Sequence, residues 1–220
     1  MTLARQLEPE VMDTPEEARE YDEMDHSSVN QAFVADMLSS DFVVGDVLDL
    51  GTGTARIPIE LCRRCEDCRV MAVDLSAYML DLAMYNLEVA GLTHRIELQQ
   101  IDSKDMPFAD NMFDTVMSNS IIHHIADPSS VFYEAIRVTK PGGRLFFRDL
   151  ARPTDQDELR RLVDLYAGSE SDHARQLFEQ SLHAALTVGE VRALLAPLGY
   201  AAATVQMTSD RHWTWTAVRE

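Results

Sequence analysis

The residues best suited to hold a small charged molecule lie between Val47 and Arg56. An apolar run that contains Asp49 leads into Gly51-Thr52-Gly53, and a helical pattern follows. Glycine lacks a Cβ atom, so the turn can be tight and its backbone N–H groups can approach a ligand closely. The Asp49 carboxylate precedes the first glycine by two residues, where it can pair with an ammonium group and would repel a phosphate.

The glycine spacing disfavours two better-known nucleotide loops. The dinucleotide fingerprint G-x-G-x-x-G requires a small residue at its sixth position, where this chain has Arg56. A phosphate-binding loop would require Gly-Lys-Ser/Thr, and the segment has no such tripeptide. A nicotinamide-dependent oxidoreductase is therefore disfavoured, and a glycine turn that binds nothing remains an alternative.

Two further apolar runs end in acidic residues. Asp74 closes the first run about 20 residues after the glycines, the separation at which a second parallel strand brings a carboxylate to ribose hydroxyls. Asp74 could instead cap the helix that follows, although Ser76 is better placed as the cap. Asp102 and Ser103 close the second run, and a simple turn is the alternative reading of this pair.

The elements that must position these residues alternate between strand and helix. A fourth apolar run over 112–120 becomes polar at Asn119, a helix is predicted over 128–138, and Pro-Gly-Gly at 141–143 predicts a turn into a fifth strand. Alternation of this kind predicts an α/β fold with a doubly wound, mostly parallel sheet. Such sheets bind ligands at the carboxyl ends of their strands.

Taken in order, these features resemble the class I S-adenosylmethionine-dependent methyltransferases. The Arg-Val-x-Lys-Pro-Gly-Gly pattern that begins at Arg137 is typical of a small-molecule branch similar to the ubiquinone/menaquinone C-methyltransferases. The resemblance covers roughly residues 40–150, and Ala55 stands where many members have a third glycine. It implies a Rossmann-like, mostly parallel seven-stranded sheet with an antiparallel edge hairpin, and S-adenosylmethionine as cofactor. It implies cofactor contacts from Asp49, Gly51, Gly53, Asp74, Leu75, Asp102, Ser103 and Asn119.

Outside the sheet the pattern predicts helices at both ends of a single domain. Thr14 and Pro15 are a helix start, and a second amino-terminal helix follows. Apolar residues at three- and four-residue spacing predict a helical lid, and Thr187 with Glu190 predicts a capping box. The expected parts are amino-terminal helices over 1–40, a cofactor core over 41–150, the lid over 151–187, and a helix and hairpin over 188–220.

Methyl transfer is an in-line displacement, so the protein mainly positions the nucleophile and excludes water. A base is needed only for a protonated nucleophile. The adjacent histidines 123 and 124 are disfavoured as shared metal ligands, because neighbours on a helix point about 100° apart. We expect one ring to pack inside and the other to face the pocket. The predicted catalytic residues are His123, His124, Tyr21 and Arg148, and the predicted substrate contacts are His26, Asn30 and Asp149, with a solvated helix joint as the alternative near His26.

Cys62, Cys65 and Cys68 have a spacing that suits metal ligation. No fourth ligand follows at a suitable distance, so no metal is predicted. The odd number of cysteines argues against a disulfide framework. We therefore expect free thiols.

Composition limits the partners. The chain has 220 residues with 37 acidic and 19 basic side chains, a formal charge of −18. This charge disfavours nucleic acids and anionic membranes, and no apolar run reaches the ~20 residues of a membrane span. We expect a cytoplasmic enzyme that methylates the nitrogen or oxygen of a small polar molecule. The alternatives are a C-methyltransferase of a quinone-like ring and a non-catalytic S-adenosylmethionine-binding protein.

Overall fold

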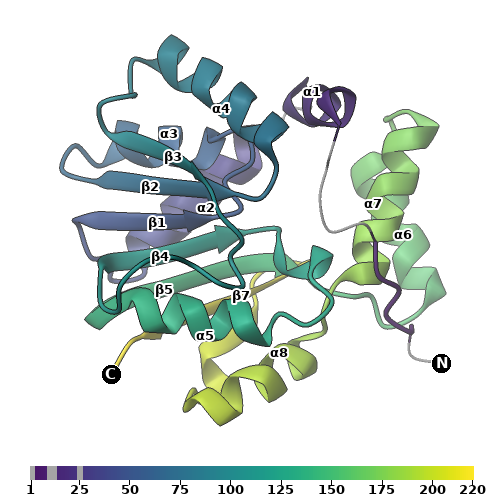
Figure 1. The fold of residues 1–220 in the computed structure, drawn as a ribbon. Helices are drawn as coiled ribbons and strands as arrows, with labels where there is room; N and C mark the ends of the chain where they lie inside the picture. The colour runs from purple at the N-terminus through teal and green to yellow at the C-terminus, as the bar shows by residue number, and fades with distance from the viewer. Residues whose placement is uncertain (1–2, 9–13, 24–26) are drawn as a thin grey trace. The chain divides into compact units, whose positions relative to one another are not determined.

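The fold is built around a seven-stranded sheet. The computed structural model describes residues 3–8, 14–23 and 27–220, without the side chains of Glu17, Tyr21 and Glu23. The strand order is β3-β2-β1-β4-β5-β7-β6 (Figure 1). β1 pairs in parallel with β2 and β4, β2 pairs in parallel with β3, and β6 pairs antiparallel with β7. This order confirms the predicted Rossmann-like sheet and its edge hairpin. The strands are β1 Asp46–Leu50, β2 Arg69–Asp74, β3 Ile96–Gln100, β4 Phe113–Asn119, β5 Thr139–Leu150, β6 Val205–Met207 and β7 His212–Val218.

The chain divides into two compact units, which we describe one at a time. The first, called here the core unit, comprises residues 11–119, 129–147 and 216–220. The second, the helical unit, comprises residues 1–10, 120–128 and 148–215. Strands β5 and β7 contribute residues to both units.

In the core unit, helices α2, α3 and α4 pack on the sheet through one apolar cluster. The helices are α1 Pro15–Glu23, α2 Ser27–Ser39, α3 Arg56–Arg64, α4 Ala77–Ala90 and α5 Ser129–Val138. Phe33 of α2 lies edge-on to Phe146 of β5, with ring centroids 5.1 Å apart. Burial of such side chains contributes about 1.5–3 kcal/mol each. The cluster joins side chains of α2, α3 and α4 to strands β1 and β2: Phe33, Val34, Met37, Ile59, Leu61, Leu87, Val47, Val70 and Ala72.

Local sequence signals set the ends of α4. The Ser76 side chain accepts a hydrogen bond from the backbone N–H of Met79, which confirms Ser76 as the helix cap. At the other end Gly91 adopts φ +69°, a left-handed conformation that glycine takes without steric cost. The helix that follows β2 is therefore fixed at both ends by residues next to it in the chain.

The Pro141-Gly142-Gly143 segment lies within β5 and does not precede it as a separate turn. Gly142 has φ +80°, and its N–H donates to the carbonyl of Arg219 at 2.7 Å. Arg219 N–H donates in return to the Gly143 carbonyl at 2.9 Å. The pairing with the end of the chain, which a local pattern cannot reveal, extends the strand through the glycines.

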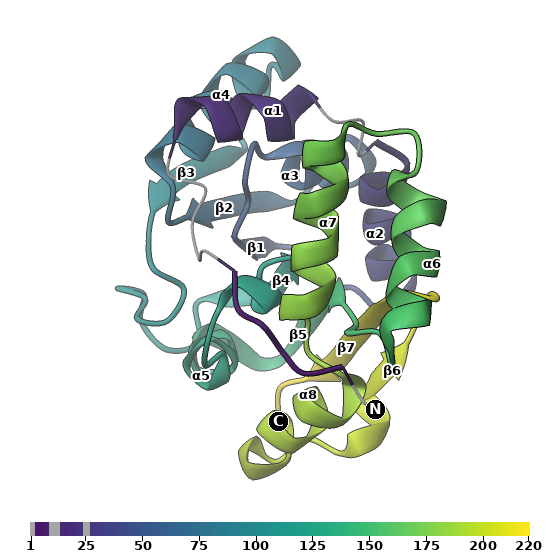
Figure 2. The ribbon, with the colours of Figure 1, turned by 90° about the vertical axis from the view of Figure 1, so that its right-hand side faces the viewer.

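In the helical unit, the predicted insertion is helical. It contains α6 Gln156–Ala167 and α7 Asp172–Ala184, which lie side by side in Figure 2 and contact each other. Their apolar faces form a core of Leu159, Leu162, Val163 and Leu182 with the β5 residue Leu150. Helix α8 Val188–Leu195 begins with the predicted capping box between Thr187 and Glu190. The predicted helical character of this segment is confirmed, and its role as a lid stays a prediction.

The cysteines depart from expectation. Cys65 and Cys68 form a disulfide, whereas Cys62 is a free, buried thiol. The pair lies between α3 and β2 with Cα atoms 5.7 Å apart, which is within the range that a disulfide spans. The Arg95 guanidinium donates to the carbonyls of all three cysteines and orders this short connection. The prediction of three free thiols is therefore wrong for two of them.

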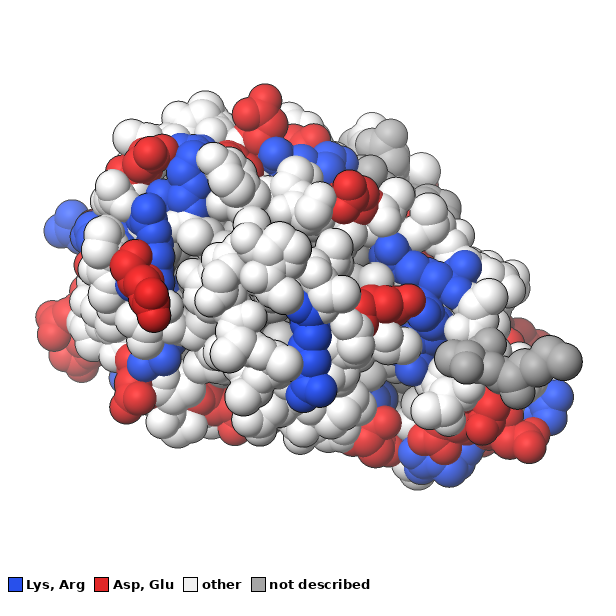
Figure 3. Space-filling view, turned by 90° about the horizontal axis from the view of Figure 1, so that it is seen from below, with Lys and Arg blue, Asp and Glu red and all other residues white. Residues whose placement is uncertain are grey.

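One face of the molecule carries charged side chains of both signs (Figure 3). On the face drawn in Figure 3, acidic and basic side chains are interspersed among uncharged ones and are not sorted by sign. Among the described helices, none has the length and apolar character needed to cross a membrane.

Candidate active site

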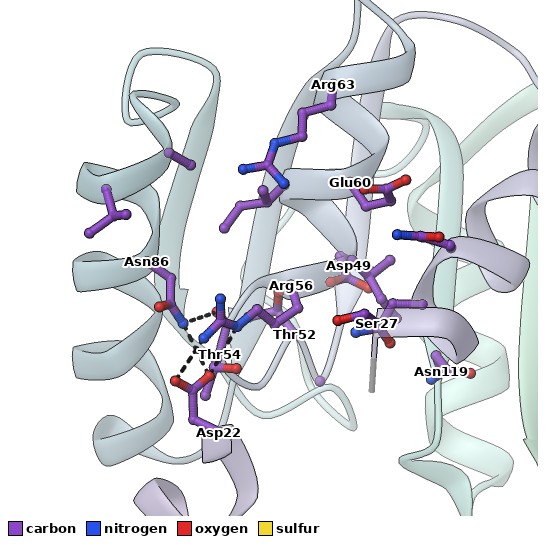
Figure 4. A pocket seen from close by; sticks show the side chains of 17 residues that line it. Asp22, Ser27, Asp49, Thr52, Thr54, Arg56, Glu60, Arg63, Asn86 and Asn119 are labelled. Atoms are coloured by element: carbon purple, nitrogen blue, oxygen red, sulfur yellow. Dashed lines mark hydrogen bonds and ion pairs between the residues drawn. The ribbon is translucent and has the colours of Figure 1, made fainter. Parts of the chain in front are cut away.

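A cavity of about 400 Å³ opens at the carboxyl end of β1 in the core unit. This volume falls within the usual range of small-molecule sites. Its wall includes four predicted site residues, Asn30, Asp49, Gly51 and Asn119. Figure 4 shows Asp49 and Asn119 toward one end of the cavity and a network around Asp22 toward the other.

The backbone of the glycine turn is hydrogen-bonded to the end of β2. Gly51 and Gly53 adopt φ +68° and +54°, and Ala55 takes the same left-handed region at φ +60°. The N–H groups of Gly51 and Thr52 both donate to the Val73 carbonyl at 2.9 Å. The turn therefore offers a ligand close backbone approach, while these two donors are used to join β1 to β2.

Asp74 closes the same turn. One carboxylate oxygen accepts from the Gly53 N–H at 2.8 Å and the other from the Ser76 N–H at 2.9 Å. Burial raises the pKa of this carboxyl group. The sequence suggested that the Ser76 cap leaves Asp74 free, but both oxygens of Asp74 accept hydrogen bonds from the protein. A carboxylate that accepts two hydrogen bonds still has further acceptor sites.

Asp102 is a turn residue in this structure. Its carboxylate accepts from the Lys104 N–H at 2.9 Å and lies 3.6 Å from the Lys104 ammonium. The side chain is 41% exposed. Asp74, Leu75, Asp102 and Ser103 do not line the cavity, so their predicted cofactor contacts remain predictions.

Asp49 has the most perturbed environment in the cavity. Its side chain is buried, and among the described residues its Oδ2 atom has no hydrogen-bond partner. Burial raises the pKa of Asp49 to about 7; the Thr52 side chain opposes this rise, and the negative charge of Asp74 adds to it. A buried carboxylate costs free energy unless it is paired, so this oxygen is suited to a cationic ligand group.

A network that sequence reasoning missed joins α1 to the glycine turn. The Asp22 carboxylate accepts two hydrogen bonds from the Arg56 guanidinium at 3.1 and 2.9 Å. Asn86 of α4 donates to Asp22 at 3.2 Å and to the Thr54 carbonyl at 3.0 Å (Figure 4). Charged residues on separate exposed helix faces give no sequence signal that they meet.

In the helical unit, the two adjacent histidines surround a carboxylate. His123 and His124 belong to the short helix η1 Ile122–His124. The Glu8 Oε1 atom lies 3.4 Å from His123 Nε2 and 3.2 Å from His124 Nδ1. Glu8 was missed because nothing in the amino-terminal pattern places it near residue 123.

Asp149 anchors this cluster. Its Oδ1 lies 2.5 Å from His123 Nδ1, and its Oδ2 accepts from the N–H groups of Ile122 and His123. Oδ1 also accepts from the Leu150 N–H at 2.6 Å. The carboxylate predicted to contact substrate is therefore buried and engaged with the protein.

The histidine rings do not diverge as helix geometry suggested. Their centroids are 4.1 Å apart with planes tilted by 34°, and both rings reach Glu8. Side-chain torsions bring the rings together, which the angle between adjacent helix positions does not exclude. His123 is buried as expected for one of the two, whereas the His124 side chain is 22% exposed and does not line the cavity.

The remaining predicted residues are placed as follows. Arg148 is buried, and its Nε donates to the Thr214 hydroxyl at 3.0 Å. His26 and the Tyr21 side chain lie outside the described part of the chain. Their predicted contacts, like the catalytic roles of the histidines, stay predictions.

A parallel sheet with a glycine turn after β1, an acid at the end of β2 and a cavity above the turn defines a nucleoside-binding α/β fold. Comparison with known proteins shows what this part of the chain is similar to. Residues 48–147 match the model of a methyltransferase domain, and about half of the chain is similar to ubiquinone/menaquinone C-methyltransferases.

Two curated relatives illustrate the likeness. A ubiquinone/menaquinone biosynthesis C-methyltransferase (UbiE) of Geotalea daltonii is 31% identical over 110 residues, 50% of this chain and 47% of the relative. A demethylmenaquinone methyltransferase of Desulfitobacterium hafniense is 36% identical over 109 residues, 49% of this chain and 43% of the relative. The chain thus matches about half the length of these relatives.

Solved structures extend the likeness of fold beyond that segment. A methyltransferase from Aquifex aeolicus, described as dependent on S-adenosylmethionine, superposes with a TM-score of 0.70 at 19% identity. The superposition covers 94% of this chain and 99% of that one. The helices outside residues 48–147 therefore belong to a known variant of the fold.

Proposed function

We propose that this protein transfers the methyl group of S-adenosylmethionine to a small molecule. The observation that carries the proposal is the buried Asp49 carboxylate, whose Oδ2 lacks a partner among the described residues and faces a cavity of small-molecule size. The methionine end of the cofactor carries an ammonium group. Its N–H would donate a charge-assisted hydrogen bond to this oxygen. When bound, the cofactor supplies an electrophilic methyl group.

The residues around the glycine turn divide the binding task. Asp49 holds the ammonium group, and Asn30 and Asn119 supply amide groups to the same cavity. Asp74 keeps the turn closed through Gly53 and accepts from the ribose hydroxyls with its remaining lone pairs. Asp102 and Ser103 are assigned to the adenine.

Replacing Asp74 with alanine is expected to weaken binding of S-adenosylhomocysteine by tenfold or more. The change removes the acceptor of the Gly53 and Ser76 N–H groups as well as the ribose contact, and each lost acceptor costs about 1–3 kcal/mol. Isothermal titration calorimetry on folded protein measures the affinity. Asp81→Ala is the control, because Asp81 is an exposed carboxylate on α4, the helix that follows Asp74. This variant should bind as the wild type does. Unchanged affinity in Asp74→Ala would contradict the ribose assignment.

For the acceptor we favour a small polar molecule that is methylated on nitrogen or oxygen. The matched segment 48–147 excludes α6 and α7, so its likeness to the relatives does not carry their acceptor over to this chain. The buried Arg148 guanidinium suits a carboxylate-bearing acceptor. The second candidate, C-methylation of a quinone-like ring, is supported by the names of the relatives.

Radiolabelled S-adenosylmethionine with a panel of amines, amino acids, phenols, thiols and demethylated quinones tests the proposal. We expect transfer to at least one small polar acceptor, and loss of that transfer in Asp49→Asn. Transfer to the quinones alone would overturn the ranking of acceptors. Cofactor binding without transfer to any class would indicate a sensor, and failure to bind the cofactor would refute the proposed function.

A further inference from the structure

We infer that the helical unit contains a zinc-binding site formed by Glu8, His123 and His124. One ligand atom from each residue, Glu8 Oε1, His123 Nε2 and His124 Nδ1, lies within 4.8 Å of the other two. Two imidazoles and one carboxylate are the protein ligands of open zinc sites, in which a water or substrate atom completes the tetrahedron. This inference is independent of the proposed methyl transfer and departs from the sequence, which predicted no metal.

The distances from Glu8 Oε1 to the two histidine nitrogens fit tetrahedral coordination. With zinc bonds of about 2.0–2.1 Å, tetrahedral ligand atoms lie about 3.3 Å apart. Glu8 Oε1 is 3.4 Å from His123 Nε2 and 3.2 Å from His124 Nδ1. Octahedral coordination at the same bond length would bring adjacent ligand atoms to about 3.0 Å.

The groups behind the ligands hold them in the required form. The contact between His123 Nδ1 and Asp149 at 2.5 Å places the ring proton on Nδ1 and leaves the Nε2 lone pair for a metal. Carboxylate–histidine–metal arrangements of this kind orient the ring and raise its basicity. Behind Glu8, the Ser181 hydroxyl donates to Oε2 at 3.2 Å and leaves Oε1 for the metal.

The charge balance also favours a cation. The Glu8 side chain is 8% exposed, and in the described part of the chain its Oε1 has no hydrogen-bond partner. Glu8 and Asp149 carry two negative charges. The nearby Arg5 guanidinium offsets one of these charges. Its N–H groups donate hydrogen bonds to backbone carbonyls, those of His123, Ile125, Ala126 and Ala184. A desolvated carboxylate oxygen between two imidazole nitrogens needs either a metal ion or a proton on His123.

Zinc content distinguishes the metal from the proton. The 220-residue chain is stripped with a chelator, and zinc affinity is measured at pH 8 by competition with a chromogenic chelator. We expect about one zinc per chain, a loss of affinity of at least 100-fold in Glu8→Gln and in His124→Gln, and a loss of 10–100-fold in Asp149→Asn. Cobalt substitution should give the intense visible bands of a tetrahedral site.

Matched variants locate the metal. His94 lies on the exposed surface of the core unit, and His94→Gln should bind zinc as tightly as the wild type. Joint replacement of Cys62, Cys65 and Cys68 by serine should also retain the metal. Fluorescence of Trp213 and Trp215, both buried in the helical unit, verifies folding of that unit in each variant, and circular dichroism verifies the whole chain. The inference would be overturned by absence of stoichiometric zinc in the wild type, or by zinc that survives Glu8→Gln and His124→Gln yet is lost with the cysteines.

Discussion

S-adenosylhomocysteine is expected to bind on the order of tenfold more tightly at pH 7.5 than at pH 5.5. Burial raises the pKa of Asp49 to about 7, so most molecules of free protein carry a neutral Asp49 at the lower pH. The ammonium group of the ligand needs the ionised carboxylate, so binding at low pH must release a proton. Calorimetry in buffers of different ionisation enthalpy measures that release, which should approach one proton near pH 6.

The Asp49→Asn variant removes both the charge pair and the titration. We expect affinity to fall about 100-fold at pH 7.5, since hydrogen bonds to charged groups contribute about 1.5–3 kcal/mol, and we expect the remaining affinity to be independent of pH. Asp114→Asn serves as the control, because Asp114 lies on β4 and is absent from the cavity wall. Wild-type affinity that does not change with pH would contradict the assignment of Asp49 to the ammonium group.

The same titration affects stability without ligand. The folded-state pKa of Asp49 lies above its ordinary value of 3.8. Its stabilising contribution to the free energy of unfolding is therefore complete below pH ~4 and is lost as the pH rises toward 7. The ligand-free Asp49→Asn variant should therefore be more stable than the wild type at pH 8, by roughly 2–4 kcal/mol. Urea unfolding at pH 5 and pH 8 measures the difference. A variant that is less stable than the wild type at pH 8 would indicate that the carboxylate is paired in the free protein.

Much of the fold could be predicted because its signals are local. The glycine turn, the Ser76 cap and the box between Thr187 and Glu190 each join residues a few positions apart, so a short window of sequence contains the whole motif. Apolar periodicity in turn gave α6 and α7. Where a distant segment contributes, as Arg219 does beside Gly142, the local pattern led to the wrong boundary.

The site was predictable only in part for the same reason. Asp49 follows from its distance to Gly51, but the use of the turn's N–H groups by Val73 depends on how β2 pairs with β1. Glu8 approaches the histidines through tertiary packing, and no periodicity in its own segment encodes that contact. Residue type located the candidates, and tertiary structure decided which of their atoms are occupied.

Asp149→Ala is expected to destabilise the helical unit by about 3–5 kcal/mol, a large share of the stability of a typical domain. The change leaves the N–H groups of Ile122, His123 and Leu150, together with the His123 ring, without their buried acceptor. Asp149→Asn retains the shape and one acceptor oxygen, so about half that effect is expected. Asp164→Ala, at a side chain that is 71% exposed, should change stability by less than about 0.5 kcal/mol.

Urea denaturation followed by tryptophan fluorescence measures this effect where it arises. The two tryptophans of the chain, Trp213 and Trp215, are both fully buried in β7 within the helical unit. Circular dichroism reports on both units together. If the fluorescence midpoint falls while part of the dichroism transition keeps its wild-type midpoint, the two units unfold separately. Equal midpoints for Asp149→Ala and Asp164→Ala would contradict the structural role of the carboxylate, because a buried group that anchors three backbone N–H groups cannot be as dispensable as an exposed one.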